Sequence, residues 1–191
     1  VKMSLIPFYN KYMPSRPSID EVGDVSLVNL RHIPLDNIGN AFLKRAVDIV
    51  GSLLLILCTS PIMLFAAIGV KLSSPGPILF KQERVGLNKT PFYMYKFRSM
   101  RVNDKQNTGW STNSDPRKTK FGSFIRKFSI DELPQFFNVL MGDMSLVGPR
   151  PELPYFVNQF KESVPLYMVK HQVRPGITGW AQVNGFRGDT S

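Results

Sequence analysis

The sequence contains a single cysteine, Cys58, and only two histidines, His32 and His171. One cysteine excludes an internal disulfide framework and suits a reducing compartment, and its position in an apolar run favours a packing role. The two histidines lack metal-ligand spacing, so neither indicates a metal site. Acidic residues are also scarce, with 14 against 24 basic residues and a net charge of +10. An anionic partner is therefore expected, and charge alone leaves nucleic acid, an anionic lipid surface and nucleotide-sugar phosphates eligible.

The length of 191 residues suits one modest domain with an appendage, and a hydrophobic content of 43% can support a core. No secretory signal is visible at the start. Because the chain begins with Val1 and ends at Ser191 without an obvious stop, we expect it to be part of a longer protein. Residues 1–40 are mixed in character with scattered prolines, and they are predicted to be a linker or the end of an upstream region.

Residues 46–70 form the most apolar stretch of the chain. A straight helix of these 25 residues would reach about 37 Å, enough to cross a hydrocarbon core of about 30 Å. Pro61 argues against a simple span, because inside a helix it removes a backbone bond and clashes with the carbonyl of Leu57, at a cost of about 3 kcal/mol. The hydroxyls of Thr59 and Ser60 beside it can satisfy the freed backbone groups.

Cations flank both ends of this stretch: Lys44 and Arg45 precede it and Lys71 follows it. That pattern is unusual for a span but natural if both ends return to the same cytoplasmic face. The residues alone leave a re-entrant helix-break-helix and a kinked spanning helix evenly matched, since proline is tolerated in membrane helices. Asp48 is predicted to lie at the interface or to pair with a cation such as Lys44, because a carboxylate deep in lipid costs about 2.5 to 3.5 kcal/mol or more.

The remaining sequence predicts small elements. Residues 78–80 and 92–95 read as short strands of a β-hairpin, with Lys96 at the end of the second strand. Residues 103–118 are polar and predict a loop. Residues 152–161 carry apolar side chains at helical spacing, which predicts an amphipathic helix that packs on the core or lies on a membrane surface.

Asp131 and Glu132 are adjacent carboxylates at a predicted helix start, with Arg126 before them and Arg150 after them. This combination suits phosphoryl transfer through a covalent carboxyl phosphate. An aspartate can attack phosphorus, its neighbour can hold a divalent metal, and guanidinium groups can grip diphosphate oxygens bidentately. A structural alternative is that Ser129 and Glu132 form a capping box that simply starts the helix.

Four motifs follow one another along the chain. They are Lys96-Phe97-Arg98-Ser99-Met100, Asp131-Glu132-Leu133-Pro134, Gly148-Pro149-Arg150-Pro151 and Arg174-Pro175-Gly176-Ile177-Thr178-Gly179. Together they resemble the bacterial sugar transferase family, the monotopic polyprenyl-phosphate hexose-1-phosphate transferases or phosphoglycosyl transferases. The resemblance covers residues 41–191.

The resemblance implies an α+β, predominantly helical fold. A re-entrant membrane helix-break-helix, broken at Ser60 and Pro61, joins a small cytoplasmic catalytic domain with a short β-hairpin and amphipathic surface helices. We therefore expect a linker or upstream end over 1–40, the re-entrant helix over 41–75, and the catalytic domain over 76–191. The implied location is the bacterial inner membrane, with the catalytic domain on the cytoplasmic face.

The resemblance also implies a reaction. A UDP-sugar gives its sugar-1-phosphate to undecaprenyl (polyprenyl) phosphate in the bilayer and UMP is released, as a first membrane step of exopolysaccharide, capsule or other glycan assembly. On that pattern Asp131 is the nucleophile that forms an aspartyl-phosphosugar intermediate, and Glu132 assists it in binding Mg²⁺. The residues implied in substrate binding are Arg126, Arg150, Lys96 and Arg174, of which the last two match less closely.

Two other functions are weighed against this one: a peripheral membrane-binding module and a metal-dependent phosphohydrolase. A nucleic-acid partner has little support, since the basic residues are spread out rather than stacked into a stripe. Residues 180–189 look more like the enzymes that start with glucose or galactose than those that use acetamido sugars. The oligomeric state is left open, with a homo-oligomer among the alternatives.

Overall fold

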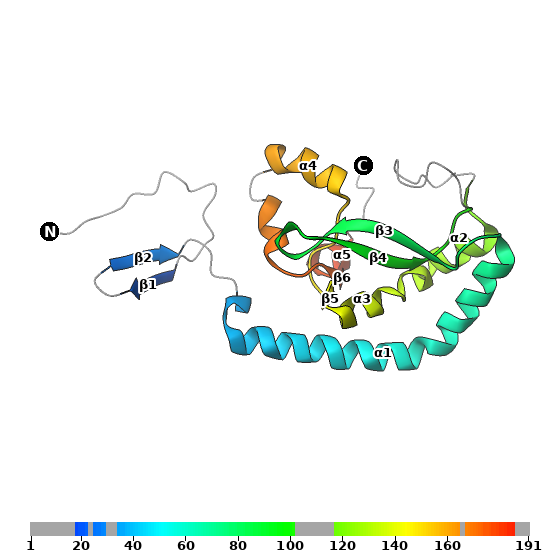
Figure 1. The fold of residues 1–191 in the computed structure, drawn as a ribbon, viewed down its shortest axis with the longest axis horizontal. Coiled ribbons are helices and arrows are strands. Elements are labelled where there is room, and N and C mark those ends of the chain that lie inside the picture. The colour runs from blue at the N-terminus through cyan, green and yellow to red at the C-terminus, as the bar shows by residue number, and fades with distance from the viewer. Residues whose placement is uncertain (1–17, 23–24, 30–33, 102–116, 165–166, 186–191) are drawn as a thin grey trace.

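The computed structural model describes residues 18–22, 25–29, 34–101, 117–164 and 167–185 (Figure 1). The α-helices are α1 (Ile38–Ser73), α2 (Lys120–Lys127), α3 (Gln135–Met141), α4 (Pro154–Ser163) and α5 (Trp180–Val183). The strands are β1 (Ser18–Val22), β2 (Val25–Asn29), β3 (Leu79–Val85), β4 (Pro91–Phe97), β5 (Ser145–Val147) and β6 (Gly176–Thr178). Short 3-10 turns are η1 (Pro34–Asp36), η2 (Leu87–Lys89), η3 (Ile130–Glu132) and η4 (Tyr167–Gln172). The predicted mixture of helices and small sheets is confirmed.

The first pair of strands was not predicted. β1 and β2 pair antiparallel, with Val22 opposite Val25, inside the segment that the sequence suggested was a linker. Their β-branched residues are a strand signal, but strands of five residues give too short a pattern to stand out beside scattered prolines. Most of the predicted loop at 103–118 lies outside the described residues.

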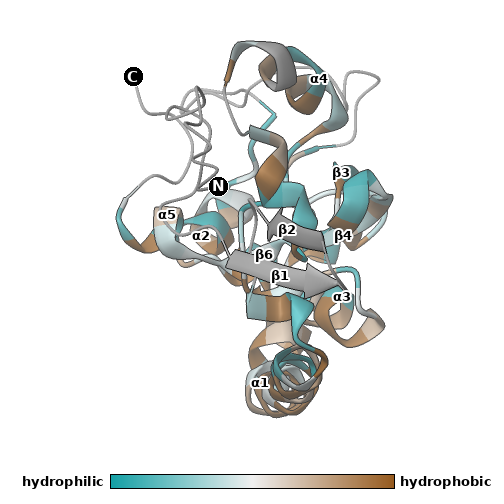
Figure 2. Cartoon of the chain, turned by 90° about the vertical axis from the view of Figure 1, so that its left-hand side faces the viewer, coloured by the Kyte–Doolittle hydropathy of each residue, from teal (hydrophilic) through white to brown (hydrophobic). Residues whose placement is uncertain are grey.

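The long helix α1 contains the whole apolar stretch in 36 residues. It is long and apolar enough to cross a membrane, and only 11% of its most apolar window is buried inside the protein. Figure 2 shows this helix nearly end-on at one edge of the molecule, with apolar residues around it. A surface of this kind is stable against lipid and unfavourable in water, so α1 is the candidate for membrane association in the described part of the chain.

Pro61 lies inside α1 and the helix continues through it, so Ser60 and Pro61 do not interrupt the helix as the expected helix-break-helix would. Figure 1 shows instead that α1 is strongly bent in its second half. Ser60 Oγ donates a hydrogen bond of 2.8 Å to the carbonyl of Leu57, the group whose usual partner a proline at position 61 removes. Thr59 Oγ1 donates to Leu55 O at 2.6 Å. The predicted hydroxyl compensation is confirmed, and it lets the helix bend without leaving bare carbonyls in an apolar medium.

The first half of α1 is tied to the rest of the chain through polar groups. Asp48 is 2% exposed and accepts hydrogen bonds from Lys44 Nζ (2.6 Å), Ser145 Oγ (3.0 Å) and the Leu146 backbone N–H (3.1 Å). The predicted pairing with Lys44 is therefore confirmed. The same carboxylate also anchors β5 on α1, which no local pattern indicated.

The second half of α1 packs through apolar residues. Ala66 and Val70 are fully buried against Phe97 of β4 and Ile125 of α2. Phe121 of α2 lies so close to α1 that a side chain at Gly69 would collide with its ring. This cluster packs the second half of α1 against β4 and α2, whereas the opposite face of α1 stays exposed.

β3 and β4 form the predicted hairpin, longer than the sequence indicated, with Phe80 opposite Lys96 and Arg84 opposite Phe92. Successive side chains in a strand alternate between its two faces, so Arg84 and Lys96 share one face with Met94. That inner face packs on Val139 of α3 in a second apolar cluster. The inner face of the hairpin thus presents Arg84 and Lys96 to the C-terminal half of the chain.

β5 and β6 pair in parallel and bring together two motifs whose glycines, Gly148 and Gly176, lie 28 residues apart. Their backbones touch so closely that an added Cβ at Gly148 would lie 2.4 Å from the Arg174 carbonyl oxygen, and one at Gly176 would lie 2.0 Å from the Gly148 nitrogen. Only glycine fits at such an approach. The two glycine-proline motifs form one structural unit.

The predicted amphipathic helix is present as α4, which begins two residues later than expected. Val157 is buried and Tyr155 is 72% exposed. Before α4, Glu152 forms a backbone bridge to Val85, and its carboxylate accepts hydrogen bonds from Tyr167 Oη and Lys170 Nζ. This contact fixes α4 and η4 on the hairpin.

Candidate active site

The two carboxylates lie in the short turn η3, directly before α3. Ser129 has φ 56° and ψ 22°, a left-handed conformation that is uncommon for serine, and its side chain makes no capping hydrogen bond. The capping-box alternative is therefore wrong. The helix itself starts three residues after Glu132, with Pro134 at its N-cap. The turn presents Asp131 and Glu132 outside the regular helix, where helix formation does not explain them.

Asp131 is 8% exposed. Burial is the main influence on this carboxyl group and raises its pKa from 3.8 to about 6. Lys96 and Arg126 oppose the shift by favouring the charged form, and Glu132 adds to it by repulsion. A carboxylate that has lost its water is a stronger nucleophile than a hydrated one, and near neutral pH most of this group is still ionised.

Glu132 is held by the hairpin. Lys96 Nζ lies 2.7 Å from Glu132 Oε1, and both side chains are partly exposed, at 19% and 28%. The pair joins β4 to η3, so the lysine that the sequence suggested as a substrate ligand also positions the second carboxylate. Two of the predicted site residues thus come together through tertiary contact.

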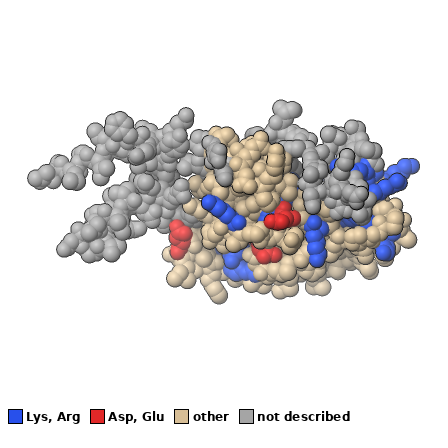
Figure 3. Space-filling view, turned by 45° about the horizontal axis from the view of Figure 1, so that its top comes forward, with Lys and Arg blue, Asp and Glu red and all other residues tan. Residues whose placement is uncertain are grey.

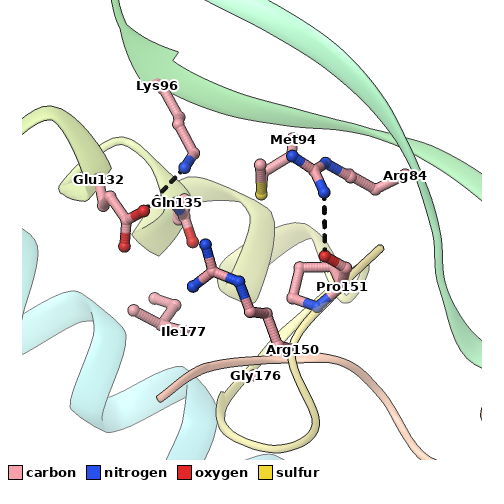
Figure 4. A pocket seen from close by; sticks show the side chains of 9 residues that line it. All are labelled: Arg84, Met94, Lys96, Glu132, Gln135, Arg150, Pro151, Gly176 and Ile177. Carbon is pink, nitrogen blue, oxygen red and sulfur yellow. Dashed lines mark hydrogen bonds and ion pairs between the residues drawn. The ribbon is translucent and has the colours of Figure 1, made fainter. Parts of the chain in front are cut away.

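A pocket lies beside this pair, between the hairpin and the β5–β6 unit (Figure 4). Its walls include Glu132, Lys96 and Arg150 from the predicted set. The lining residues are Arg84, Met94, Lys96, Glu132, Gln135, Arg150, Pro151, Gly176 and Ile177. Three cations against one carboxylate make the described lining electropositive, which suits an anionic ligand.

Arg84 is the pocket cation that the sequence did not identify. Its Nη1 donates to Pro151 O at 3.2 Å and its Nη2 donates to Gln82 Oε1 at 2.7 Å. Burial lowers its pKa to about 10, and repulsion from Arg150 adds to the effect. Strand alternation would have placed Arg84 beside Lys96 if the hairpin register had been predicted, since 84, 94 and 96 share a face.

The other two predicted cations lie elsewhere. Arg126 is exposed in the last turn of α2 and contributes to the field at Asp131 without lining the pocket. Arg174 is exposed, and its Nε donates to Gly142 O at 2.8 Å, beyond the last turn of α3. Arg45 from α1 donates to Val139 O and Leu140 O at the same helix end. Cations stabilise a helix C-terminus, so Arg174 has a structural role in α3.

Charged side chains of both signs lie on the face of the molecule that Figure 3 shows. Figure 3 shows acidic and basic side chains side by side in the middle of that face, with further basic groups toward its right-hand end. A negatively charged ligand would be attracted by the basic groups on this face.

The two adjacent carboxylates are the donors that could hold a divalent cation. No group of three or more His, Cys, Asp or Glu side chains forms a metal cage within the described residues. Magnesium does not need one, because it is usually held by one or two carboxylates together with substrate phosphates and water. Asp131 and Glu132 therefore fit Mg²⁺ bound together with a phosphorylated substrate better than a permanently bound structural metal.

Comparison with known proteins identifies a family. The family model described as "Bacterial sugar transferase" matches residues 39–191, from the start of α1 to the last residue of the chain. The match includes both carboxylates, the hairpin and the β5–β6 unit.

Individual relatives are similar over nearly the whole chain. A UDP-glucose:undecaprenyl-phosphate glucose-1-phosphate transferase of Escherichia coli (strain K12) is 48% identical over 97% of this chain and 40% of that protein. A UDP-N-acetylgalactosamine-undecaprenyl-phosphate N-acetylgalactosaminephosphotransferase of Aeromonas hydrophila is 47% identical over 96% of this chain and 44% of that protein. The exopolysaccharide production protein PSS of Rhizobium leguminosarum bv. phaseoli is 46% identical over 78% of this chain and 76% of that protein. The chain thus spans less than half the length of the first two.

Proposed function

The chain belongs to the bacterial sugar transferase family, and from this premise we propose that it transfers a sugar-1-phosphate from a UDP-sugar to undecaprenyl phosphate, releasing UMP. The names of the relatives from Escherichia coli and Aeromonas hydrophila support these two substrates. The observation that carries the proposal is the turn of Asp131 and Glu132 beside a pocket lined with cations. Glu132 lines this pocket, and Asp131 beside it feels the charges of Lys96 and Arg126, an arrangement that supports phosphoryl transfer with Asp131 as the nucleophile.

The reaction proceeds in two steps. An oxygen of the Asp131 carboxylate attacks the β-phosphorus of the UDP-sugar, and the bond from that phosphorus to the bridging oxygen breaks, so that UMP leaves with the electron pair. An oxygen of the lipid phosphate then attacks the same phosphorus and releases the carboxylate. The raised pKa of Asp131 supports this role, because it marks a desolvated carboxylate beside the cations Lys96 and Arg126.

Charge neutralisation comes from the residues around the carboxylates. Arg150 lines the pocket and Arg126 acts on Asp131 from α2, so both can stabilise negative charge on phosphate oxygens. Lys96 does so while holding Glu132 in place. Mg²⁺, held by Asp131 and Glu132, would supply additional positive charge to the phosphate oxygens.

The substrates explain the bent apolar helix. The acceptor has its phosphate at the membrane surface and its tail in lipid, so the active site must lie at the interface. α1 carries Lys44 and Arg45 before its apolar stretch and Lys71 after it, it contains Pro61, and its second half is strongly bent (Figure 1). In our proposal both ends of α1 lie on the cytoplasmic face of the inner membrane, and the helix dips into one leaflet.

Cysteine labelling tests this topology. In a Cys58→Ser background, Asn40→Cys reports the start of α1 and Glu83→Cys reports the hairpin. A membrane-impermeant maleimide should label both sites only in inverted vesicles. Adding Pro61→Ala should straighten the helix toward a span and expose position 40 to the exterior of intact cells, with Ile62→Ala as the matched control. Labelling of position 40 from outside without Pro61→Ala would mean that α1 spans the membrane.

We propose glucose or galactose as the sugar. The relatives are named for different sugars at nearly the same identity, 48% for glucose and 47% for N-acetylgalactosamine, so overall similarity does not separate them. A panel of UDP-sugars, assayed for UMP release with undecaprenyl phosphate present, should give the highest kcat/KM with UDP-glucose or UDP-galactose. A preference for an acetamido sugar would contradict this choice.

The fate of the sugar phosphate tests the reaction itself. With donor labelled in the sugar and its phosphate, the chain in lipid nanodiscs should move the label to the lipid only when polyprenyl phosphate is present. Label appearing in water as free sugar-1-phosphate would identify a phosphohydrolase instead. Binding without UMP release would identify a binding module.

A further inference from the structure

Arg84 differs from Lys96, another cation of the pocket, in the partners that the protein provides. Its two terminal nitrogens donate to a carbonyl oxygen, Pro151 O, and to an amide oxygen, Gln82 Oε1, both of which are neutral. Its Nε is buried and has no hydrogen-bond partner among the described residues. By contrast, Lys96 has a carboxylate partner at 2.7 Å. The guanidinium is therefore held in position without being neutralised.

A partly buried cation without a carboxylate partner raises the free energy of the folded protein until an anion binds to it. Removing a charge from water costs free energy, and neutral hydrogen-bond acceptors return only part of it. No carboxylate lies within salt-bridge distance of Arg84 in the described chain, although Glu132 and Glu152 attract it from farther away. The loss of water and repulsion from Arg150 outweigh that attraction.

The geometry places two like charges around one space. Figure 4 shows Arg84 entering the pocket from the hairpin, while Arg150 enters it from the loop after β5. Two guanidinium groups that repel one another in the free protein are suited to a ligand with two negative groups, because each can then donate hydrogen bonds to an oxygen on its own side.

The position of the Arg84 guanidinium is fixed by contacts with the segment before α4. Pro151 O holds its Nη1, and the next residue, Glu152, is bonded through its backbone to Val85. Tyr167 and Lys170 in turn donate to the Glu152 carboxylate. The guanidinium is thus preorganised by its own contact with Pro151 O and by the Val85–Glu152 bridge next to it, which favours tight and oriented binding.

We propose that Arg84 binds the diphosphate of the nucleotide donor from the hairpin side, opposite Arg150, a role that rests on the proposed function. Together the two arginines hold the two phosphates, while Lys96 holds Glu132 within the turn η3. Arg84 is therefore a substrate-binding residue that recognises the diphosphate rather than the nucleoside.

Binding of UDP and of uridine tests this assignment. In nanodiscs, Arg84→Gln should lose ten- to hundredfold in UDP affinity by calorimetry, the loss expected for a charge-assisted hydrogen bond. Uridine affinity, followed by ligand-observed NMR, should stay unchanged. Lys81→Gln is the matched control, because Lys81 lies on the same strand with its side chain on the opposite, exposed face. It should bind both ligands as the unaltered chain does.

The same variants separate this inference from the proposed function. The KM for the UDP-sugar should rise with Arg84→Gln by a factor similar to the loss of UDP affinity. If the unaltered chain releases UMP and Arg84→Gln matches it in KM and UDP affinity, only the role of Arg84 fails. If the unaltered chain neither binds UDP nor releases UMP, the proposed function fails. Should Arg84→Gln not fold, Arg84→Lys replaces it, and unaltered UDP affinity there would overturn the role because an ammonium lacks the planar fork.

Discussion

The junction between α1 and β5 and the turn before α3 each bury an aspartate beside a lysine. At the junction, Asp48 is 2% exposed and accepts hydrogen bonds from Lys44, Ser145 and Leu146. In the turn, Asp131 is 8% exposed and its neighbour Lys96 donates to Glu132 instead. The Asp48 carboxylate is matched by three directed donors and serves structure. At Asp131 desolvation outweighs the lysine, the arginine and the backbone hydrogen bond that favour the charged form, which is the pattern expected of a functional carboxylate.

The largest effect should follow from removing the nucleophile. We predict that Asp131→Asn lowers kcat by more than about a thousandfold, as expected for loss of a covalent nucleophile. Mass spectrometry of protein incubated with donor alone should find a phosphosugar adduct on the unaltered chain and none on the variant. An adduct on the Asn variant would refute the role, and Asp143→Asn, in the loop after α3, is the control carboxylate.

At the junction the same substitution should affect folding. Asp48→Asn should destabilise the protein by about 2 to 3 kcal/mol, because it removes the charged acceptor from a buried network and leaves Lys44 without its carboxylate partner. Chemical unfolding in detergent micelles measures the change. A variant as stable as the unaltered chain would show that the Asp48 network does not hold α1 on β5.

Replacing Asp131 by asparagine should stabilise the protein, whereas the same change at Asp48 should destabilise it. Its folded pKa, about 6, lies above the ordinary value of 3.8, so the folded state loses stability as pH rises from 4 through 6. Asp131→Asn removes that cost and should stabilise the protein by about 1 to 3 kcal/mol at pH 8, and by little at pH 4. Unfolding curves at the two pH values give the comparison, and destabilisation at pH 8 would contradict a desolvated carboxylate.

The smallest effect expected concerns the pH dependence of turnover. Because attack requires the ionised form, kcat/KM should rise about tenfold between pH 5 and pH 7 through the pKa of about 6. Lys96→Gln removes a charge that favours ionisation and should move the midpoint upward. A profile that is flat from pH 5 to pH 7 would show that Asp131 ionises lower than its burial indicates.

Several features could be predicted from the sequence because they depend on near neighbours. The pairing of Lys44 with Asp48 follows from i, i+4 spacing on a helix. The compensation of Pro61 by Ser60 follows from helix geometry in the same way. The adjacent carboxylates at 131 and 132 could be recognised as a phosphoryl-transfer pattern by residue type alone.

Other features required contacts between distant segments. Arg84 could not be assigned to the pocket without the register of β3 and β4. Arg174 stays a predicted substrate ligand, and only the folded chain reveals that its Nε donates to Gly142 O at the end of α3. Ser129 and Glu132 match a capping box in sequence, but the left-handed backbone at Ser129 turns the chain away from a helix. No pattern of neighbouring residues contains this information.

The sequence alone was thus enough to predict the long apolar helix, the excess of positive charge and the pair of carboxylates. These features depend on hydropathy, charge and helix spacing, which act over a few residues. Folding settled which cations share the pocket, which aspartate is satisfied and which is desolvated, and where the two glycine motifs touch. Those outcomes depend on burial and on pairing between strands and loops, and a side chain acquires them only when the chain has packed.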